Sequence, residues 1–397
     1  MSRSGKPRLA LVVSHPIQHF VPFYRYIAAA GDVELTVVYC SDIGVRPYHD
    51  DEMGVTIAWR MPLTEGYPHR FLPEAAQITT TGFRDVDNPS VGPALDAIEP
   101  DAVLLYGYSQ LTQLRALRWC RGNRVPALMI SDSTLIGRAG GWREVLRDFA
   151  LRPLLARFAG FLTVGDENER YLAHYGVPRE RMHRSPFTID EATFGDARGQ
   201  REVLRAKLRS ELGISADAFV GLTVGKLSPR KRGLDVAQAF SSLGADLRRK
   251  AVSVLCGNGS ELATIEAFVA QSGAPVICAG FVNVDALPAY YAAADALIHA
   301  AEHDPHPLVC SEAALMGLPM ILSDRIGAVG PSDIARPGRN ALIYPVKDVA
   351  ALTGAVKELV ADPRRAGVMA AESRTIFGEC DVRASYAGLL KAIDSVI

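Results

Sequence analysis

The stretch Ala300–Asp324, AAEHDPHPLVCSEAALMGLPMILSD, decides the fold of the second half of this 397-residue chain. It begins after one short apolar run and ends in another, which predicts a strand, a helix and a second strand. Pro307 suits the first position of that helix, because proline has no N–H to satisfy and its φ is already helical. Gly317 followed by Pro319 predicts where the helix stops. We therefore expect a helix over about 307–316 between two buried strands.

The same alternation of apolar runs and helical stretches continues through both halves of the chain. In the second half we expect strands at Phe219–Val224, Val252–Cys256, Pro275–Ala279, Ala296–His299, Met320–Ser323 and Leu342–Tyr344. In the first half we expect them at Arg8–Ser14, Glu34–Cys40, Ala102–Tyr106, Ala127–Ser131 and Gly160–Val164. Repeated strand–helix units of this kind are typical of parallel sheets covered on both faces. We therefore expect an α/β protein with two Rossmann-like domains facing across a central cleft, with ligands at the carboxyl ends of the strands.

A charged segment, Asp190–Ser215, separates the two halves and lacks a strand pattern. We therefore divide the chain into an N-terminal domain at 1–190, a linker or helix at 191–216, a C-terminal domain at 217–378 and a final helix at 379–397.

Composition restricts the class of protein. Hydrophobic residues make up 48% of the chain and charged residues 22%, and the net charge is −1. These values favour a globular protein and give no sign of nucleic-acid binding. The six cysteines stand singly, which predicts neither a zinc site nor a disulfide framework and favours a reducing cytoplasm. No apolar run is long enough to span a membrane, and the N-terminal run reads as a first strand rather than a signal segment.

The helix expected near 307–316 carries the most chemical information. Its first turn offers the backbone N–H groups of Leu308 and Val309 together with the positive end of the helix dipole, an arrangement that attracts phosphate. Asp304 lies just before the helix, and Glu312 lies about one turn inside it. Each carboxylate can accept hydroxyl groups of a ribose or a hexose. An isolated pair of acids at this spacing is, in most proteins, only surface charge.

The loops that follow the expected strands at 219–224 and 252–256 contain lysines and glycines that could contact the same ligand. Lys226 and Lys231 follow the strand at 219–224, where ammonium groups can stabilise a departing diphosphate. Gly225, Gly257 and Gly259 allow tight turns and a close approach of backbone to ligand. The alternative is that the lysines are solvated loop residues and the glycines only form turns.

Polar residues also follow strands of the first half. His15, Gln18 and His19 come after the first strand and are candidates for donor or acceptor contacts, although a packed or capping histidine at a helix entry is an equal alternative. Asp132 follows the strand at 127–131 and is either a polar group of the site or an N-cap.

Two further patterns carry less weight. Asp85-Val86-Asp87 has the spacing of a D-x-D metal motif, but that triplet is common by chance, and we expect no metal or other cofactor. Residues 138–158, RAGGWREVLRDFALRPLLARF, combine arginines with large apolar side chains. This pattern is typical either of an ordinary domain helix or of a basic amphipathic helix lying on the inner face of a membrane.

The ordered segments VGKLSPRKRGLDVAQAF (224–240), LCGNGSEL (255–262), the stretch quoted first, and GRNALIYPVKDVAAL (338–352) resemble glycosyltransferase family 4. The members are retaining enzymes with the two-domain GT-B fold that use nucleotide-sugar donors. The resemblance covers roughly 219–352. The first half is similar more loosely, and its SHPIQHFVPFYRYIA segment (14–28) resembles a subgroup of bacterial glycosyltransferases.

The resemblance implies a role for each matching residue. Glu312 matches the second acid of the family's E-x7-E motif, which holds the donor ribose, and Asp304 matches the first acid, near the transferred sugar. Lys226 and Lys231 match the basic pair at the diphosphate, and Leu308 and Val309 match backbone contacts to sugar and phosphate. The final helix, at 379–397, would return to the N-terminal domain.

Three positions depart from the family pattern. Asp304 is shorter than the usual glutamate, Lys226 stands where arginine is more common, and His306-Pro307 replaces the usual Phe-Gly, which leaves His306 as a candidate donor contact. The expected activity is transfer from a UDP-, GDP-, ADP- or dTDP-linked sugar to a glycan, lipid-linked or small-molecule acceptor, in the synthesis of bacterial surface polysaccharide or glycoconjugate. The alternatives are a nucleotide-sugar epimerase and a catalytically silent sugar-nucleotide-binding partner subunit.

Overall fold

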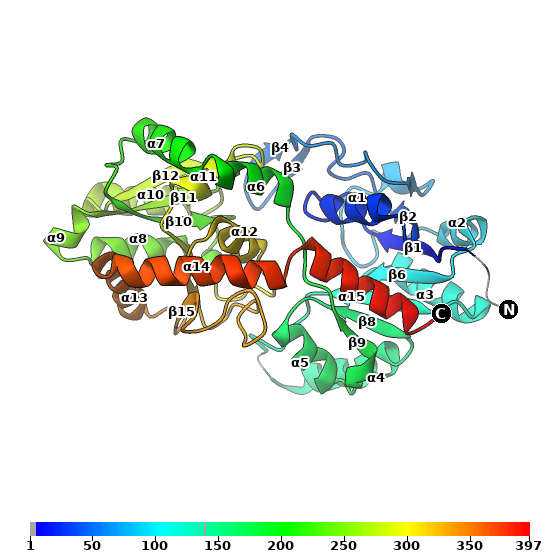
Figure 1. Ribbon diagram of the computed structural model, residues 1–397. Coiled ribbons are helices and arrows are strands. Elements are labelled where there is room, and N and C mark those ends of the chain that lie inside the picture. The colour runs from blue at the N-terminus through cyan, green and yellow to red at the C-terminus, as the bar shows by residue number, and fades with distance from the viewer. Residues whose placement is uncertain (1–4, 139) are drawn as a thin grey trace. The chain divides into compact units, whose positions relative to one another are not determined.

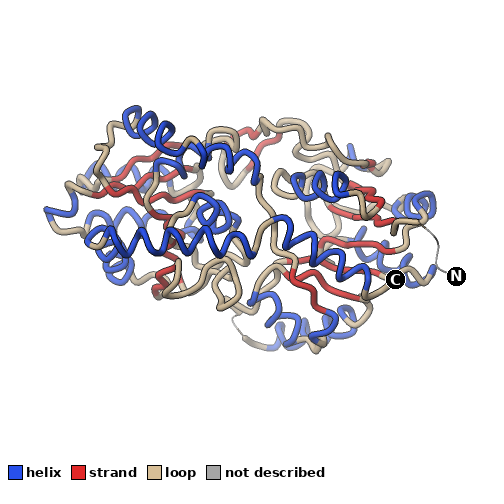
Figure 2. Tube along the Cα trace, in the orientation of Figure 1, coloured by secondary structure: helices blue, strands red, loops and turns tan. Residues whose placement is uncertain are grey.

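The computed structural model describes residues 5–138 and 140–397, which form two compact units (Figure 1). Unit 1 contains residues 5–48, 61–189 and 380–397, and unit 2 contains residues 49–60 and 190–379. Each unit has its own parallel sheet and its own buried apolar residues. Helices and strands alternate along most of the chain (Figure 2), as the sequence pattern predicts.

Unit 1 is built on a seven-stranded parallel sheet in the order β5-β2-β1-β6-β7-β8-β9. The strands are β1 (Arg8–Val13), β2 (Glu34–Tyr39), β5 (His69–Phe71), β6 (Ala102–Tyr106), β7 (Ala127–Ser131), β8 (Gly160–Thr163) and β9 (Met182–Arg184). The five strands expected from sequence are all present. The edge strands β5 and β9 were not predicted, because three residues are too few to show a pattern.

The helices of unit 1 follow these strands in turn. They are α1 (Val21–Ala30), α2 (Val91–Ile98), α3 (Leu111–Asn123), α4 (Trp142–Leu155), α5 (Asp166–His174) and α15 (Val382–Asp394), with short 3-10 turns at Ala75–Gln77 and Arg179–Arg181. Helix α15 comes from the end of the chain and packs on β8 and β9. The Ser185 hydroxyl donates to the Ser385 carbonyl at 2.9 Å, and the Ser385 hydroxyl donates to the Pro186 carbonyl at 2.6 Å.

Unit 2 is built on a six-stranded parallel sheet in the order β12-β11-β10-β13-β14-β15. Its strands are β10 (Phe219–Val224), β11 (Ala251–Cys256), β12 (Val276–Gly280), β13 (Ala296–His299), β14 (Met320–Ser323) and β15 (Ala341–Tyr344). All six were predicted to within one residue at each end. The carboxyl ends of β10, β11 and β13 carry the loops that build the candidate site.

The helices of unit 2 are α6 (Glu191–Gly199), α7 (Arg201–Glu211), α8 (Gly233–Ser241), α9 (Ala245–Arg248), α10 (Leu262–Ser272), α11 (Leu287–Ala293), α12 (Leu308–Met316), α13 (Val349–Ala361) and α14 (Pro363–Glu379), with a 3-10 turn, η3, at Pro229–Lys231. The segment treated as a linker folds as α6 and α7, which pack on α11 and α12. Arg209 is buried and donates to the Ala293 carbonyl at the end of α11 and to Asp295. Arginines thus satisfy helix-end carbonyls and attach this segment to unit 2.

Residues 49–60 also group with unit 2, although the sequence analysis placed them in the N-terminal domain. They include most of a two-stranded sheet formed by β3 (Tyr48–Asp50) and β4 (Val55–Ile57). The Asn283 amide donates to the Ala58 carbonyl at 2.9 Å, and Arg60 lies 3.3 Å from Asp285. Polar contacts of this kind leave no apolar periodicity, which is why the sequence did not reveal the association.

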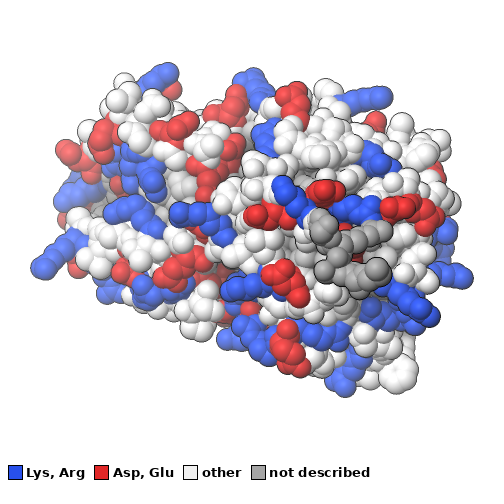
Figure 3. All heavy atoms as spheres, turned by 45° about the vertical axis from the view of Figure 1, so that its right-hand side comes forward, with Lys and Arg blue, Asp and Glu red and all other residues white. Residues whose placement is uncertain are grey.

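Lysine and arginine are interspersed with aspartate and glutamate on the face drawn in Figure 3, in keeping with the net charge of −1. None of the helices in the described parts of the chain is both long and apolar enough to cross a membrane.

Candidate active site

The amino end of α12 is the centre of the candidate site. Pro307 caps the helix with φ −69° and ψ 125°, so the helix begins at Leu308, one residue later than expected. The cause is the extended ψ of Pro307, which lies outside the helical region. Within the described chain, the backbone N–H groups of Leu308 and Val309 have no acceptor, as helix geometry requires at a first turn. Gly317 ends the helix in a left-handed conformation with φ 68°, as predicted.

Asp304 is held by two donors that reach the same carboxylate oxygen. Its Oδ2 accepts from Lys231 Nζ at 2.5 Å and from His299 Nε2 at 2.8 Å. Burial would raise the pKa of Asp304, but the hydrogen bond from His299 and the charge of Lys231 hold that pKa well below its usual range. Asp304 is therefore a carboxylate at every working pH, and its side chain is only 14% exposed.

Glu312 has a different environment, although it lies on the same helix. Its Oε2 accepts from the Tyr291 hydroxyl at 2.5 Å, and Tyr291, on α11, is fully buried. Burial raises the pKa of Glu312 to about 7, because the single hydrogen bond from tyrosine offsets only part of the lost hydration. Hydroxyl donors from a ligand would favour the ionised form, so this acid is suited to accept ribose hydroxyls.

Lys226 forms ion pairs with two carboxylates. Its Nζ lies 3.0 Å from Asp50 Oδ2 and 2.9 Å from Glu52 Oε2, both on the segment that joins unit 2 from the first half. Burial lowers the pKa of Lys226, but the two carboxylates outweigh burial and raise it overall. Lys226 is therefore charged but neutralised, and a diphosphate would have to compete with these two acids for it.

The glycines after β10 and β11 allow two loops to touch. A Cβ on Gly257 would lie 1.8 Å from the Gly225 carbonyl oxygen, and one on Gly259 would lie 2.5 Å from the Leu227 carbonyl oxygen. The loops are also joined by the Leu227 N–H, which donates to the Asn258 carbonyl at 2.8 Å. Close packing of backbone therefore explains Gly257 and Gly259 without any ligand. Gly225 has φ 139° and open space around its Cβ position.

Two other residues of the loop before α12, His306 and Glu302, contact side chains other than those that hold Asp304. His306 is buried, and its Nε2 lies 3.2 Å from Asp333 Oδ1, which is also buried. This pair anchors the loop from the interior of the unit. Glu302 lies 3.1 Å from Arg232 and 3.0 Å from Lys347, so it is part of a separate ion-pair cluster. Asp304 and Glu302 therefore have separate partners, although only one residue stands between them in the sequence.

In unit 1, the loop between β1 and α1 contains two histidines with lowered pKa values. His15 Nδ1 lies 2.9 Å from the Ser14 hydroxyl, and the His19 ring packs edge-on against Phe20 with centroids 4.1 Å apart. Burial lowers the pKa of His15 to about 4, and burial together with His15 lowers the pKa of His19 to about 3. Gln18 and Asp132 are partly exposed, in the loops that follow β1 and β7.

The acidic triplet in unit 1 is engaged in local contacts. Asp87 forms an ion pair with Arg115, and Asp85 accepts from the Thr80 hydroxyl at 2.5 Å. Among the described residues, no group of three or more histidine, cysteine or acidic side chains could hold a metal ion.

Sequence reasoning missed His299, Tyr291 and the acids of the 49–60 segment. His299 offered a signal, because it is the last residue of a strand in a parallel sheet, where ligand-facing groups collect. Tyr291 and Asp50 offered none, since their partners are distant in the sequence.

Comparison with known proteins relates part of this chain to a described family. Residues 205–376 match the family model for glycosyl transferases group 1. The chain is 26% identical over 317 residues to a GDP-mannose-dependent alpha-mannosyltransferase of Mycolicibacterium smegmatis, across 77% of this chain and 76% of the relative.

Solved structures resemble the whole chain. Anabaena Alr3699/HepE in complex with UDP superposes with a TM-score of 0.73 at 16% identity, over 98% of this chain and all of the other. A glycosyltransferase from Rickettsia africae superposes with a TM-score of 0.75 at 11% identity, over 98% of each chain. The chain therefore has the GT-B fold. The match to the group 1 glycosyltransferases lies within unit 2, at residues 205–376.

Proposed function

We propose that the protein transfers a sugar from a nucleoside-diphosphate-sugar donor to a hydroxyl acceptor with retention of anomeric configuration. The observation that carries this proposal is the arrangement at the amino end of α12, where open backbone N–H groups, an anchored carboxylate and an ammonium group come together. This combination suits a ligand that has both a diphosphate and hydroxyl groups.

Each part of the donor has a matching group in unit 2. Glu312 accepts the ribose hydroxyls and Asp304 accepts hydroxyls of the transferred sugar. Lys231 and the N–H groups of Leu308 and Val309 stabilise the diphosphate. Lys226 supplements them when the donor displaces its acidic partners. Gly225, with open space at its Cβ position, lets the donor approach the end of β10 closely.

The reaction needs few further groups. The bond between the sugar's anomeric carbon and the diphosphate oxygen breaks, and the acceptor oxygen bonds to the same face of that carbon. The acceptor proton passes to the departing diphosphate oxygen, so no separate base is required. Lys231 and the helix dipole stabilise the negative charge that develops on the leaving group, and we propose that they make a metal ion unnecessary.

The choice of donor can be narrowed by comparison. One relative is named for GDP-mannose, and a structural neighbour was solved with UDP, so guanine and uracil nucleotides are the first to test.

We propose that unit 1 provides the acceptor contacts through His15, Gln18, His19 and Asp132. The acceptor class we favour is a glycan or lipid-linked precursor of bacterial surface polysaccharide.

A peripheral contact with anionic membrane would suit a lipid-linked acceptor, and α4 supports it. One face of this helix exposes four large apolar side chains: Trp142 at 68%, Val145 at 68%, Leu146 at 59% and Phe149 at 82%. Positions i, i+3, i+4 and i+7 form a single stripe. Stripes of this size are uncommon on the free surface of a protein in water.

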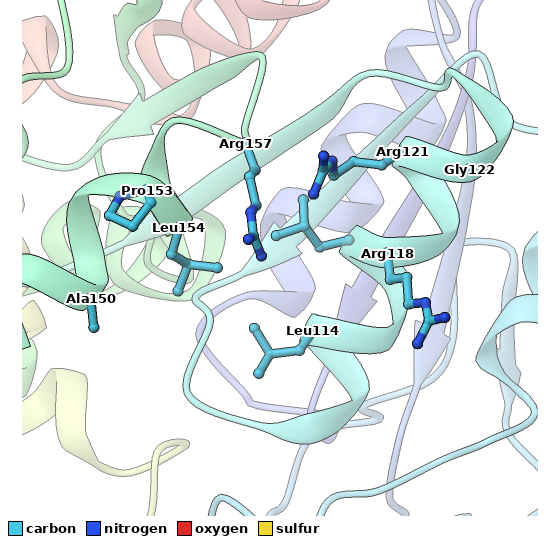
Figure 4. A pocket seen from close by; sticks show the side chains of 9 residues that line it. Leu114, Arg118, Arg121, Gly122, Ala150, Pro153, Leu154 and Arg157 are labelled. Atoms are coloured by element: carbon cyan, nitrogen blue, oxygen red, sulfur yellow. The ribbon is translucent and has the colours of Figure 1, made fainter.

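A basic hollow lies beside this stripe, between α3 and α4 (Figure 4). Arg118, Arg121 and Arg157 line it together with Leu114 and Leu154. Arg121 and Arg157 extend toward the same space in Figure 4. Arginines around an apolar floor suit lipid phosphate groups. We expect sedimentation with phosphatidylglycerol vesicles, weakened by F149D, and none with phosphatidylcholine vesicles. Equal recovery with both lipids would contradict this contact.

The transfer itself is tested with GDP-mannose, UDP-glucose and the corresponding ADP- and dTDP-sugars, each with a panel of simple glycoside acceptors. We expect one donor to give nucleoside diphosphate and a product that keeps the donor's anomeric configuration by NMR, undiminished by EDTA. An inverted product or loss of activity in EDTA would contradict the mechanism. Release of nucleotide without acceptor glycosylation would favour an epimerase, and binding without any turnover would favour a silent subunit.

A further inference from the structure

We infer that His299 is a positioning residue that holds the carboxylate of Asp304 in the orientation required to receive the transferred sugar. The inference rests on the proposed function, because it assigns Asp304 to that sugar. His299 is the last residue of strand β13, whereas Asp304 lies in the loop between β13 and α12.

The contacts of Asp304 fix both its backbone and its side chain. Its N–H donates to the Arg325 carbonyl at 3.3 Å, and its carbonyl accepts from the Gly327 N–H at 2.9 Å. These bonds hold the backbone against the loop after β14. His299 and Lys231 then approach the carboxylate and bond to Oδ2. In the part of the chain that the structure describes, no donor reaches Oδ1, so that oxygen is the one offered to a ligand.

His299 suits this role because it is itself immobile. It is 4% exposed and ends β13, which pairs with β10 on one side and β14 on the other. Because the partner atom is a carboxylate oxygen, the Nε2 of His299 carries the proton that it donates. Burial and the charge of Lys231 lower the pKa of His299 despite the nearby carboxylate, which favours the neutral ring.

The two donors to Asp304 are not equivalent during turnover. Lys231 is a flexible ammonium group, and a bound diphosphate attracts it through charge. His299 has no such alternative, because its strand fixes it beneath the acid. When the donor is bound and Lys231 turns toward the diphosphate, His299 remains as the group that prevents the short side chain of Asp304 from rotating. A carboxylate held in this way is pre-organised for the sugar hydroxyl.

The test compares two variants of similar size. His299→Leu removes the donor, whereas His299→Gln keeps an N–H near the position of Nε2. We expect H299L to lower kcat by ten- to a hundredfold, the range for a lost charge-assisted hydrogen bond. We expect H299Q to recover most of that loss. Binding of the nucleoside diphosphate alone, GDP or UDP, should change by less than twofold in both variants, since Glu312 and the diphosphate contacts remain.

A double-mutant cycle tests whether His299 acts through Asp304. In the D304N background, H299L should have little further effect on kcat, because the orientation it secures no longer matters. Full additivity of the two losses, or wild-type kcat in H299L, would overturn the inference. Nucleotide binding distinguishes failure of the His299 inference from failure of the proposed function. If neither GDP nor UDP nor any other nucleoside diphosphate binds the wild-type protein, the proposed donor site is wrong. A circular-dichroism melt checks that H299L is folded.

Discussion

The loops that follow β10 and β13 in unit 2 differ in charge from the loop that follows β1 in unit 1. In unit 2 these loops carry two groups of ionised side chains. Lys231 bonds to Asp304, which also accepts from His299, and Lys226 lies between Asp50 and Glu52. In unit 1 the loop after β1 carries two histidines that burial keeps neutral, and one of them, His19, packs against the ring of Phe20. The difference indicates a division of labour. Ionised groups suit a diphosphate that gains charge as it leaves, whereas neutral polar groups suit an acceptor hydroxyl.

The largest expected effect comes from the lysine that contacts Asp304. Lys231→Ala removes the ammonium group available to the leaving diphosphate, and we expect kcat/KM to fall by about 10³-fold. Lys226→Ala should cost only about tenfold, because Asp50 and Glu52 already neutralise that lysine. Steady-state kinetics of both variants provide the measurement. Equal losses would show that the donor displaces Asp50 and Glu52 from Lys226 at little cost.

The raised pKa of Glu312 predicts opposite effects on binding and stability. The ionised form accepts ribose hydroxyls, so nucleotide affinity should rise between pH 6 and 8 as this group, with its pKa of about 7, loses its proton. Glu312→Gln should lower the affinity at pH 8 and remove this pH dependence.

Without ligand, the same substitution should stabilise the protein. The folded-state pKa lies above the ordinary value of 4.5, so the folded state binds more protons than the unfolded state, and stability falls as pH rises toward 7. At pH 8 we expect E312Q to be more stable than the wild type by about 3 kcal/mol, the equivalent of that pKa difference. The advantage should vanish near pH 4. Thermal melts across this range measure it, and a pH-independent difference would contradict the assignment.

Glycine-to-alanine substitutions compare how much the packing of a loop in each unit contributes to folding stability, with no measurement of activity. In unit 2, Gly257→Ala places a Cβ 1.8 Å from a backbone carbonyl, and we expect it to cost about 3 kcal/mol by overpacking. In unit 1, Gly107 has φ 75° with open space around it, so Gly107→Ala should cost about 1 kcal/mol through backbone strain alone. Urea unfolding gives both values. Equal costs would mean that the loops after β10 and β11 can separate.

The smallest effect is expected from the histidines of unit 1. His19→Gln should raise the acceptor KM a fewfold and leave nucleotide affinity unchanged, because the residue belongs to unit 1. His15 and His19 are already neutral at pH 6. His19→Gln should therefore leave unchanged the rise in nucleotide affinity between pH 6 and 8. A titration of GDP or UDP at several pH values checks both points. Loss of the pH dependence in H19Q would assign it to the histidine instead of Glu312.

The sequence predicted the strands of both sheets because buried parallel strands leave long apolar runs, such as Phe219–Val224. It also predicted Gly317 as the helix end, since a left-handed residue there favours glycine. It could not predict that 49–60 joins unit 2 or that Tyr291 bonds to Glu312, because these contacts depend on side chains far apart in the chain. The roles of Asp304 and Glu312 in transfer remain predictions.

The central claim is that unit 2 binds a nucleoside diphosphate at the amino end of α12, and calorimetric titration with GDP, UDP, ADP and dTDP tests it most directly. We predict that one of them binds the wild-type protein, that E312Q and K231A each weaken it by at least tenfold, and that H19Q leaves it unchanged. Absence of binding by all four, or weakening by H19Q but not by E312Q or K231A, would contradict the account.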